Sequence, residues 1–203
     1  MEREWTPMSM TEVATRFAPL GIDWWIAGGH AIDLFLGWQS RPHADLDVEM
    51  FRSDSSHLFD LFDGWDLHGV SEGGSRPWSA SMDLDESVFG VWVRQDHAAP
   101  WQIEVLLADG DRDQWRFRRD PSITIAGRDL VRETANGIPY GTPEAQLLYK
   151  ALQTRAKDDV DLARCLHRMS DRQRSWLGHA VARMNAEHPW VEVLAASLGR
   201  QHE

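Results

Sequence analysis

The fold is decided by residues 24–50, which begin Trp24-Trp25-Ile26-Ala27-Gly28-Gly29-His30-Ala31-Ile32-Asp33 and end Asp45-Leu46-Asp47-Val48-Glu49-Met50. In the second string acidic and apolar residues alternate, which is the period-two signature of a β-strand with one buried face. Because successive side chains point to opposite faces of a strand, we expect Asp45 and Asp47 to share a face, with Glu49 farther along it. Gly28 and Gly29 are expected to form a tight turn between a short buried strand and a helix.

Paired carboxylates of this kind suit metal-dependent phosphoryl or nucleotidyl transfer. Mg²⁺ prefers hard oxygen ligands, and two metals about 3.5–4 Å apart can hold both the attacking and the leaving oxygen. A third acid, Glu104, lies among apolar residues in Gln102-Ile103-Glu104-Val105-Leu106-Leu107, where a carboxylate is costly unless it is paired or metal-bound. We predict that Asp45, Asp47 and Glu104 converge on a divalent cation. The alternative is a solvated sheet face for residues 45–49 and an exposed or salt-bridged position for Glu104.

Other residues near this string are candidates to hold phosphate. The glycine pair is either a plain turn or a turn whose backbone N–H groups meet an anion. Arg41 is close in sequence to the acidic pair, and Lys150 and Lys157 are expected to reach the triphosphate from the helical part of the chain. The alternative for both lysines is an ordinary solvated helix face. For His30 and His43 we expect structural roles rather than nucleotide contacts.

Composition narrows the function classes. The chain has 203 residues, of which 42% are hydrophobic, and a formal net charge of -11. This charge argues against a nucleic-acid partner, because a phosphate-binding surface is normally basic. It fits a cationic small molecule, attracted by a negative cleft, or it serves solubility alone. The single cysteine, Cys165, forms no internal disulfide and fits a reducing cytosol. The sequence offers no signal peptide or membrane span, so a cytoplasmic protein is expected.

The pattern along the chain predicts strands first and helices last. We expect the following elements: helix 9–20, strand 23–27, helix 30–36, strand 46–50, helix 55–62, loop 69–77, strands 88–94 and 102–107, weak strand 123–125, a helix capped by Thr142, helix 158–169, a helix opened by a Ser170-x-x-Gln173 capping box, and a short helix 191–198. Such segregation predicts an α+β fold with a mixed sheet. We expect a catalytic domain over residues 1–138 and a C-terminal helical domain over residues 139–203.

The acidic and glycine motifs together carry a family resemblance. Gly28-Gly29, Asp45-x-Asp47 and an acid on a later strand resemble the DNA polymerase β-like nucleotidyltransferase superfamily. The fuller string over residues 25–33, with Arg41-x-His43-x-Asp45-Leu46-Asp47, is similar to its aminoglycoside nucleotidyltransferase branch, which includes 2″-adenylyltransferases and lincosamide-modifying relatives. The later strings are Gly137-Ile138-Pro139-Tyr140, Pro143-Glu144, Leu147-Leu148-Tyr149-Lys150 and Lys157-Asp158-Asp159-x-Asp161, which are similar to the helical part of the same branch. The resemblance spans about residues 20–165.

The resemblance implies a polymerase β-like mixed sheet, a C-terminal helical lobe and a cleft between them. It implies an antibiotic-resistance enzyme that uses Mg²⁺ and ATP, or another NTP, to move NMP onto a drug hydroxyl. Asp45 and Asp47 match the metal pair, Glu104 matches the third acid, as ligand or as base, and Gly28 and Gly29 match the nucleotide-gripping turn. Two positions depart from the wider superfamily: Gly29 stands where serine is common, and Glu104 where Asp is more frequent.

Several alternatives stay open. An aminoglycoside is the first acceptor because of the acidic balance, but a lincosamide, a protein or a tRNA end, as in toxin–antitoxin nucleotidyltransferases, would use the same chemistry. A non-catalytic nucleotide-binding module with the same fold is the remaining reading. We expect no membrane partner and no nucleic-acid substrate, and a monomer and a homodimer are equally compatible with the sequence.

Overall fold

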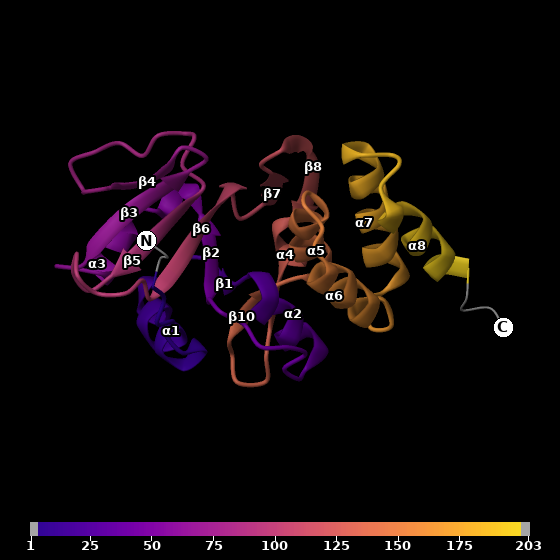
Figure 1. Cartoon of the computed structure of the whole chain (residues 1–203), viewed down its shortest axis with the longest axis horizontal. Helices are drawn as coiled ribbons and strands as arrows, with labels where there is room; N and C mark the ends of the chain where they lie inside the picture. Colours follow the sequence, from indigo (N-terminus) through magenta and orange to yellow (C-terminus); the bar gives the residue numbers. More distant parts are fainter. Residues whose placement is uncertain (1–3, 200–203) are drawn as a thin grey trace.

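The computed structural model describes residues 4–199, which form a mixed sheet followed by a group of helices (Figure 1). The elements are α1 (Met10–Phe17), η1 (Ala18–Leu20), β1 (Trp24–Ile26), α2 (Gly28–Leu36), β2 (Asp47–Phe51), η2 (Arg52–Asp54), α3 (His57–Leu61), β3 (Asp66–Ser71), β4 (Gly74–Pro77), β5 (Gly90–Arg94), β6 (Ile103–Gly110), β7 (Gln114–Phe117), β8 (Asp120–Ala126), α4 (Gly127–Leu130), β9 (Val131–Glu133), β10 (Pro139–Gly141), α5 (Pro143–Ala151), α6 (Ala156–Leu166), α7 (Asp171–Met184) and α8 (Pro189–Leu198).

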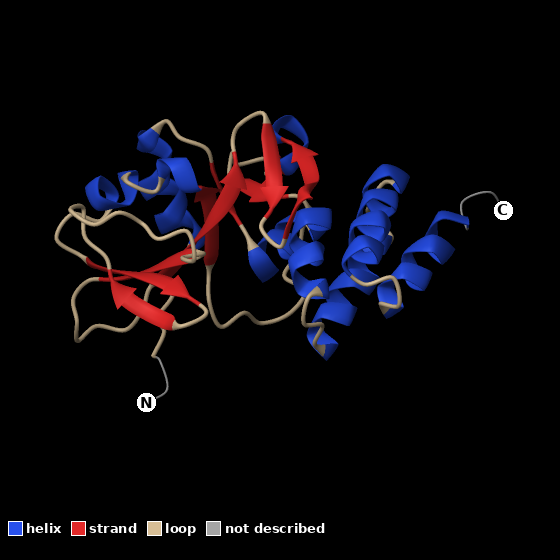
Figure 2. Cartoon of the chain, turned by 90° about the horizontal axis from the view of Figure 1, so that it is seen from above, coloured by secondary structure: helices blue, strands red, loops and turns tan. Residues whose placement is uncertain are grey.

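The strands form one mixed sheet in the order β4-β3-β5-β6-β2-β1-β10-β9, and β7 and β8 extend from β6. The pairs β2·β6 and β1·β10 are parallel, and the remaining pairs are antiparallel. The sheet with α1 and α3 occupies one end of the molecule, and α7 and α8 form the other end (Figures 1 and 2). The predicted α+β fold with flanking helices is confirmed.

The alternating pattern in β2 separates two faces of the sheet. Val48 and Met50 are fully buried in a core that α1 and α3 cover, together with Trp24 and Ile26 of β1. Glu49 points to the opposite face, where it is paired in register with Trp25. The period-two reading of residues 46–50 is therefore confirmed. It is incomplete at one end, because β2 begins at Asp47 and Asp45 is an exposed residue of the preceding loop.

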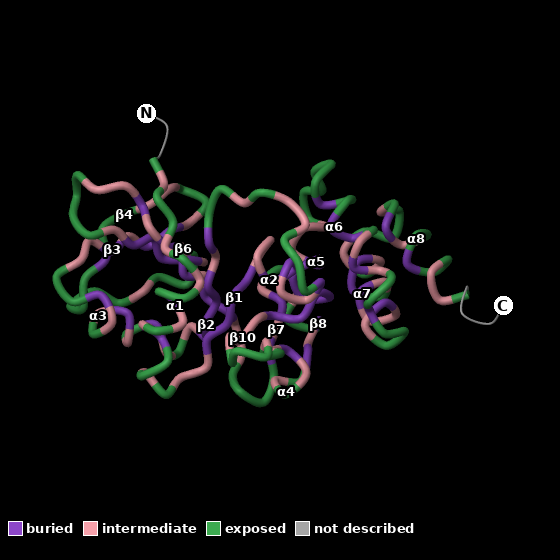
Figure 3. The backbone as a smooth tube through the Cα atoms, turned by 90° about the horizontal axis from the view of Figure 1, so that it is seen from below, coloured by how far each residue is buried: buried purple, intermediate pink, exposed green. Residues whose placement is uncertain are grey.

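The C-terminal helices share a second core with the far end of the sheet. Trp25, Trp115 and Phe117 pack in one cluster with Leu148 of α5 and Leu177 of α7. Figure 3 shows these buried stretches running from β1 and β2 into α5 and α7. The predicted division at residues 138 and 139 stays a prediction, since apolar packing continues across it.

Helix ends follow local capping chemistry. Ser170 accepts a hydrogen bond from the Gln173 N–H, and the Gln173 side chain accepts one from the Ser170 N–H, so the predicted capping box is confirmed. Thr142 does stand at the N-cap of α5, but its hydroxyl is buried and makes no cap hydrogen bond, so that part of the prediction is wrong. Cys165 is buried, and burial raises the pKa of its thiol to about 12.

Two sequence-based assignments are wrong in an instructive way. Residues 69–77 form most of the β3·β4 hairpin rather than a loop, because the glycines that suggested a loop make its turn and its edge; Gly74 has a φ of 108°. Gly28 and Gly29 are the first residues of α2 rather than a turn before it. The strand β7 was not predicted, because Asp111 and Asp113 sit in its connection to β6 and give that region a loop-like composition.

None of the helices over residues 4–199 is long and apolar enough to cross a membrane.

Candidate active site

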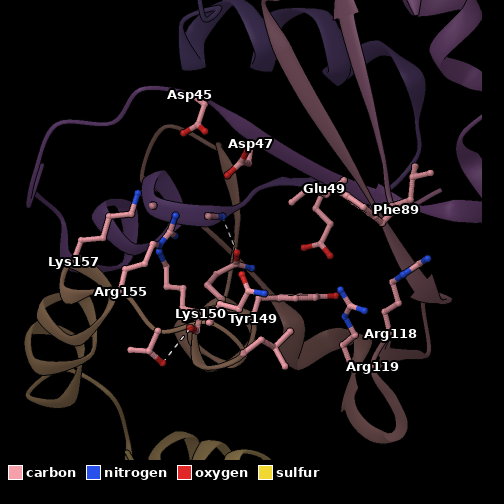
Figure 4. Close-up of a pocket in the computed structure, with 18 of the residues that line it drawn as sticks. Asp45, Asp47, Glu49, Phe89, Arg118, Arg119, Tyr149, Lys150, Arg155 and Lys157 are labelled. Carbon is pink, nitrogen blue, oxygen red and sulfur yellow. Dashed lines mark hydrogen bonds between the residues drawn. The ribbon is translucent and has the colours of Figure 1, made fainter. Parts of the chain in front are cut away.

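A large cleft opens between the sheet and the C-terminal helices. Its volume is about 1920 Å³, and its wall includes Asp45, Asp47 and Glu49 together with the first turn of α2 and the C-terminal end of α5. Figure 4 shows the three acidic side chains in a row, with Lys157, Arg155 and Lys150 near one end and Arg118 and Arg119 at the other. A cleft of this size, with apolar and charged side chains in its wall, is a candidate small-molecule site.

Two of the predicted acidic residues lie on neighbouring strands, and the third lies just before one of these strands. Asp47 at the start of β2 lies in register with Glu104 of β6, so the two side chains share a face of the sheet. Glu104 does not line the cleft wall itself, and its carboxylate lies over Gly90, where an added Cβ would meet Glu104 Oε1 at 3.3 Å. Asp45 precedes the strand and reaches the same region from the loop, close enough for its charge to act on Asp47.

Burial and the neighbouring negative charges disfavour the ionised form of Asp47. Burial, followed by the negative charges of Glu104 and Asp45, raises the pKa of Asp47 to about 8 against the opposing effect of Lys150. A carboxylate so disfavoured in its charged form is a strong site for a divalent cation, because the cation supplies the missing positive charge. The oxygen-only donors fit Mg²⁺.

Glu49 has a larger structural role than its position along the strand suggested. It is buried, and Trp25 Nε1 donates a 2.8 Å hydrogen bond to its carboxylate. Burial raises the pKa of Glu49 to about 7, and the nearby N–H groups of Trp25, Gln146 and Trp115 act in the opposite direction.

Both glycines are required by what packs over them. Gly28 has a φ of 60°, and an added Cβ would lie 2.2 Å from Asp47 Oδ2. At Gly29 an added Cβ would lie 2.4 Å from His43 Nδ1. The N–H of Gly28 is bound to Gln146 Oε1 at 2.7 Å, while the N–H groups of Gly29 and His30 have no acceptor within their own helix. The first turn of α2 can therefore approach an anion closely.

Arg41 is held in place by a chain of polar contacts. Its Nε and NH2 atoms donate to the two carboxylate oxygens of Asp161 at 3.2 and 3.1 Å, and its NH1 lies 3.0 Å from His43 Nδ1. His43 Nε2 lies 2.6 Å from Asp33 Oδ2. Burial acts to raise the pKa of Asp33, but hydrogen bonds from Ser40 and His43 outweigh it and lower the pKa.

His30 completes a small group with Asp33 and His43. The three offer ligand atoms within 4.8 Å of one another, and burial, followed by the charge of His43, lowers the pKa of His30. Arg41 and Asp33 already occupy both ring nitrogens of His43, so this group is first of all a structural support for the Arg41 loop. That agrees with the structural role expected for both histidines.

The predicted phosphate-binding lysines differ in environment. Lys150 Nζ lies 3.2 Å from Asp158 Oδ1 and 3.1 Å from Asp161 Oδ2, and both aspartates are completely buried. Lys157 is exposed on the cleft wall. Arg155, which the sequence did not single out for phosphate, lines the same wall and bonds Asp158 at 2.9 Å. Lys150 thus has a structural task in addition to any contact with a ligand.

Several cleft residues could not be identified from the sequence. Arg118 and Arg119 come from the turn between β7 and β8, a hairpin that was not predicted, and Phe89 and Tyr149 line the wall between them and Glu49. Their only sequence signal is two adjacent arginines in an acidic chain.

Comparisons with known proteins bear on this geometry. Residues 9–76 match the family model described as aminoglycoside-2''-adenylyltransferase. The crystal structure of ANT(2'')-Ia in complex with adenylyl-2''-tobramycin is similar with a TM-score of 0.56 at 15% identity, covering 86% of this chain and 98% of that chain. Lincomycin-bound LnuA, a lincosamide antibiotic adenylyltransferase, is similar with a TM-score of 0.53 at 16% identity, covering 79% and 96%. No curated protein sequence matches the chain.

The family model that matches residues 9–76 and the two similar solved structures are of antibiotic nucleotidyltransferases. The matched segment contains the glycine pair and both aspartates of the acidic motif. The shared fold and this match agree with the nucleotidyltransferase predicted from the sequence resemblance.

Replacing Gly28 by alanine should separate backbone strain from site disruption. We expect Gly28→Ala to cost about 1–2 kcal/mol for its positive φ and also to displace the Asp47 carboxylate, which would abolish metal-dependent nucleotide binding. Gly21→Ala is the matched control, because Gly21 has a φ of 64° and no atom within 4 Å of an added Cβ. Urea unfolding and nucleotide titration measure the two effects; equal binding by both variants would contradict this account.

The raised carboxyl pKa values predict an inverse dependence of stability on pH. Between about pH 4 and pH 8 the folded metal-free chain binds more protons than the unfolded chain, so its free energy of unfolding falls as pH rises. Mg²⁺ favours the charged carboxylates, so it should raise the Tm by about 3 °C or more at about pH 8 and by less at about pH 6. Thermal melts with and without Mg²⁺ check this, and Asp47→Asn should remove most of the Mg²⁺ effect. A shift that is equal at both pH values would count against it.

The two lysines should respond differently to substitution by methionine. Lys150→Met removes one cation that pairs with both buried aspartates, Asp158 and Asp161. This change should lower the free energy of unfolding by about 3 kcal/mol. Lys157→Met, at an exposed position, should cost less than about 0.5 kcal/mol and weaken ATP binding about tenfold. Chemical unfolding and ATP titration measure both, with Lys157→Arg as the charge-preserving control. Unchanged ATP affinity in Lys157→Met would remove Lys157 from the phosphate site.

Proposed function

We propose that this chain transfers the NMP group of an NTP, AMP from ATP in the first instance, to a hydroxyl group of an antibiotic-type small molecule in a Mg²⁺-dependent reaction. The observation that carries the proposal is the pairing of Asp47 with Glu104 on neighbouring strands, with Asp45 close to Asp47 and the first turn of α2 beside them; Asp45 and Asp47 line a large cleft. Asp45 and Asp47 are the metal ligands, and Glu104 is either a further ligand or the base that accepts the hydroxyl proton.

Each part of the site has a task in this reaction. The acceptor oxygen attacks the α-phosphorus, the bond from that phosphorus to the bridging oxygen breaks, and pyrophosphate leaves in line with the attack. Gly28, Gly29, Arg41, Lys150 and Lys157 hold the triphosphate, and Glu104 takes the proton from the attacking hydroxyl. Bound Mg²⁺ would neutralise phosphate charge during the transfer.

The acceptor is drawn from two classes. An aminoglycoside is proposed first, because residues 9–76 match an aminoglycoside adenylyltransferase family model and the chain is acidic overall. A lincosamide is the second candidate, because the lincomycin-bound adenylyltransferase LnuA has a similar structure. The chain is proposed to work in the cytoplasm on small molecules and nucleotides, as a monomer or homodimer, without membrane or nucleic-acid partners.

Turnover with an acceptor panel tests the proposal. The purified chain with ATP and Mg²⁺ should produce pyrophosphate and an acceptor heavier by one AMP group, detected by mass spectrometry. Glu104→Gln should lower kcat by about a hundredfold or more if Glu104 is the base, with ATP binding retained. Asp47→Asn should lose Mg²⁺-dependent ATP binding altogether. Glu192→Gln, at an exposed position of α8, is the control for the loss of one carboxylate.

The other outcomes separate the remaining readings. Tight Mg²⁺-dependent ATP binding without a product from any acceptor or NTP would indicate a non-catalytic nucleotide-binding module. NMP found on host proteins after expression would redirect the proposal to a protein acceptor. Full activity of Asp47→Asn would refute the assignment of the metal site.

A further inference from the structure

The end of the cleft remote from Lys157 differs from the other end in the kinds of side chain that line it. We define this distal half by Glu72, Phe89, Leu106, Arg118, Arg119 and Tyr149, which come from the β3·β4 turn, the segment before β5, β6, the β7·β8 turn and α5. Figure 4 shows Phe89, Arg118 and Arg119 beyond Glu49, on the side away from Asp45 and Lys157. Its wall is built from aromatic, aliphatic and cationic side chains.

Arg118 supplies a positive charge that is held mainly by backbone carbonyl groups. Its NH2 donates to the carbonyl oxygens of Glu86 and Ser87 at 3.1 and 2.9 Å, and its NH1 lies 3.4 Å from the carbonyl oxygen of Val88. These backbone contacts fix the guanidinium across the cleft rim, and within residues 4–199 it forms no ion pair with an acid. The charge therefore remains available to a ligand.

The carboxylates of this region are already engaged. Glu72 lies 2.8 Å from Arg119 NH1, with both side chains at least half exposed, and Asp109 is paired with Arg52 at 3.2 Å. Glu49 is buried and holds the hydrogen bond of Trp25. Over the whole cleft wall, Arg and Lys side chains outnumber Asp and Glu side chains by six to four. The acidity of the chain, -11 overall, thus lies outside this wall.

The present inference rests on the proposed function, and it places the acceptor in the distal half of the cleft. The triphosphate belongs with the first turn of α2, Arg41, Arg155 and Lys157, which lie at the other end. In-line displacement requires the attacking hydroxyl to stand opposite the leaving pyrophosphate. The acceptor body consequently extends away from those cations, towards Phe89 and Arg118.

We infer that the cleft wall favours the second of the two acceptor classes proposed above over the first: the acceptor is a hydroxyl compound with an apolar face and at most one positive charge, and a polycationic aminoglycoside is the poorer acceptor. Phe89, Leu106 and Tyr149 offer an apolar surface to such a compound. Each additional ammonium group near Arg118 meets like-charge repulsion, which is strong close to a protein surface. A compound with one basic amine places that amine away from Arg118 and its apolar face on the aromatic wall.

Binding of two compounds of contrasting charge tests the inference. The full chain is titrated calorimetrically with tobramycin, a polycation, and with lincomycin, which has a single basic amine and an apolar side chain, in the presence of Mg²⁺ and a non-hydrolysable ATP analogue. We expect lincomycin to bind at least about tenfold more tightly. Arg119→Glu should strengthen tobramycin binding about tenfold, because it leaves two carboxylates at the rim, and added salt should reduce that gain.

Two further variants distinguish an effect of charge on binding from a loss of the fold. Arg118→Gln keeps a donor for the carbonyl oxygens of Glu86 and Ser87 and should favour tobramycin in the same direction. Arg128→Glu, an exposed arginine of α4 outside the cleft wall, makes the same charge change as Arg119→Glu and should leave both affinities unchanged. Melting temperatures of all variants show whether the fold is retained.

The outcomes distinguish this inference from the proposed function. The inference is overturned if wild-type chain binds tobramycin as tightly as lincomycin, if the cleft variants leave the ratio unchanged, or if neither compound binds. Efficient AMP transfer to tobramycin would overturn it while supporting nucleotidyl transfer. If the ATP analogue does not bind, the proposed function fails, and the same titrations without nucleotide still measure the charge preference of the cleft.

Discussion

Parallel pairing of β2 with β6 is the constraint on which the site depends, because it places Asp47 and Glu104 side by side. Two carboxylates so arranged repel each other, and burial adds to the cost of charging Asp47. The sheet tolerates this arrangement because its other face is filled by Val48, Met50 and the residues packed on them. Apolar burial on one face thus compensates for charge crowding on the other, and a bound cation would relieve the crowding.

Buried ion pairs attach the helical part of the chain to this sheet. Asp161 of α6 receives both Arg41, from the loop before β2, and Lys150 of α5. Asp158 receives Lys150 and Arg155. Such buried pairs contribute little net stability, yet removing one partner is costly, so they fix geometry more than they add free energy. The same cations that face the cleft therefore also determine how the helices sit against the acidic strand.

The sequence predicted the parts of the fold that depend on local patterns and missed those that depend on distant partners. Alternation identified β2, and a capping box identified the start of α7, because each signal lies within a few residues. The glycines at 69–74 suggested a loop, since a single sequence does not reveal that Val91 and Gly90 pair with the start of this segment across a sheet. For Gly28 and Gly29, the reason for glycine is the approach of Asp47 and His43, which no local rule contains. The roles of the acidic triad remain a prediction that its geometry favours.

Among the sequence properties, the net charge of the whole chain was the poorest guide to the charge of the cleft. A value of -11 suggests an acidic cleft, but charge affects a ligand mainly within about 8–10 Å at physiological salt. The acidic residues 109–113 illustrate the difference: Asp109 is paired with Arg52, and Asp111 accepts hydrogen bonds from the backbone of its own turn. The residues that line the cleft nearby are Arg118 and Arg119 of the following β7·β8 turn. Acceptor choice should therefore be argued from the side chains that touch the cleft, even when the whole protein carries the opposite charge.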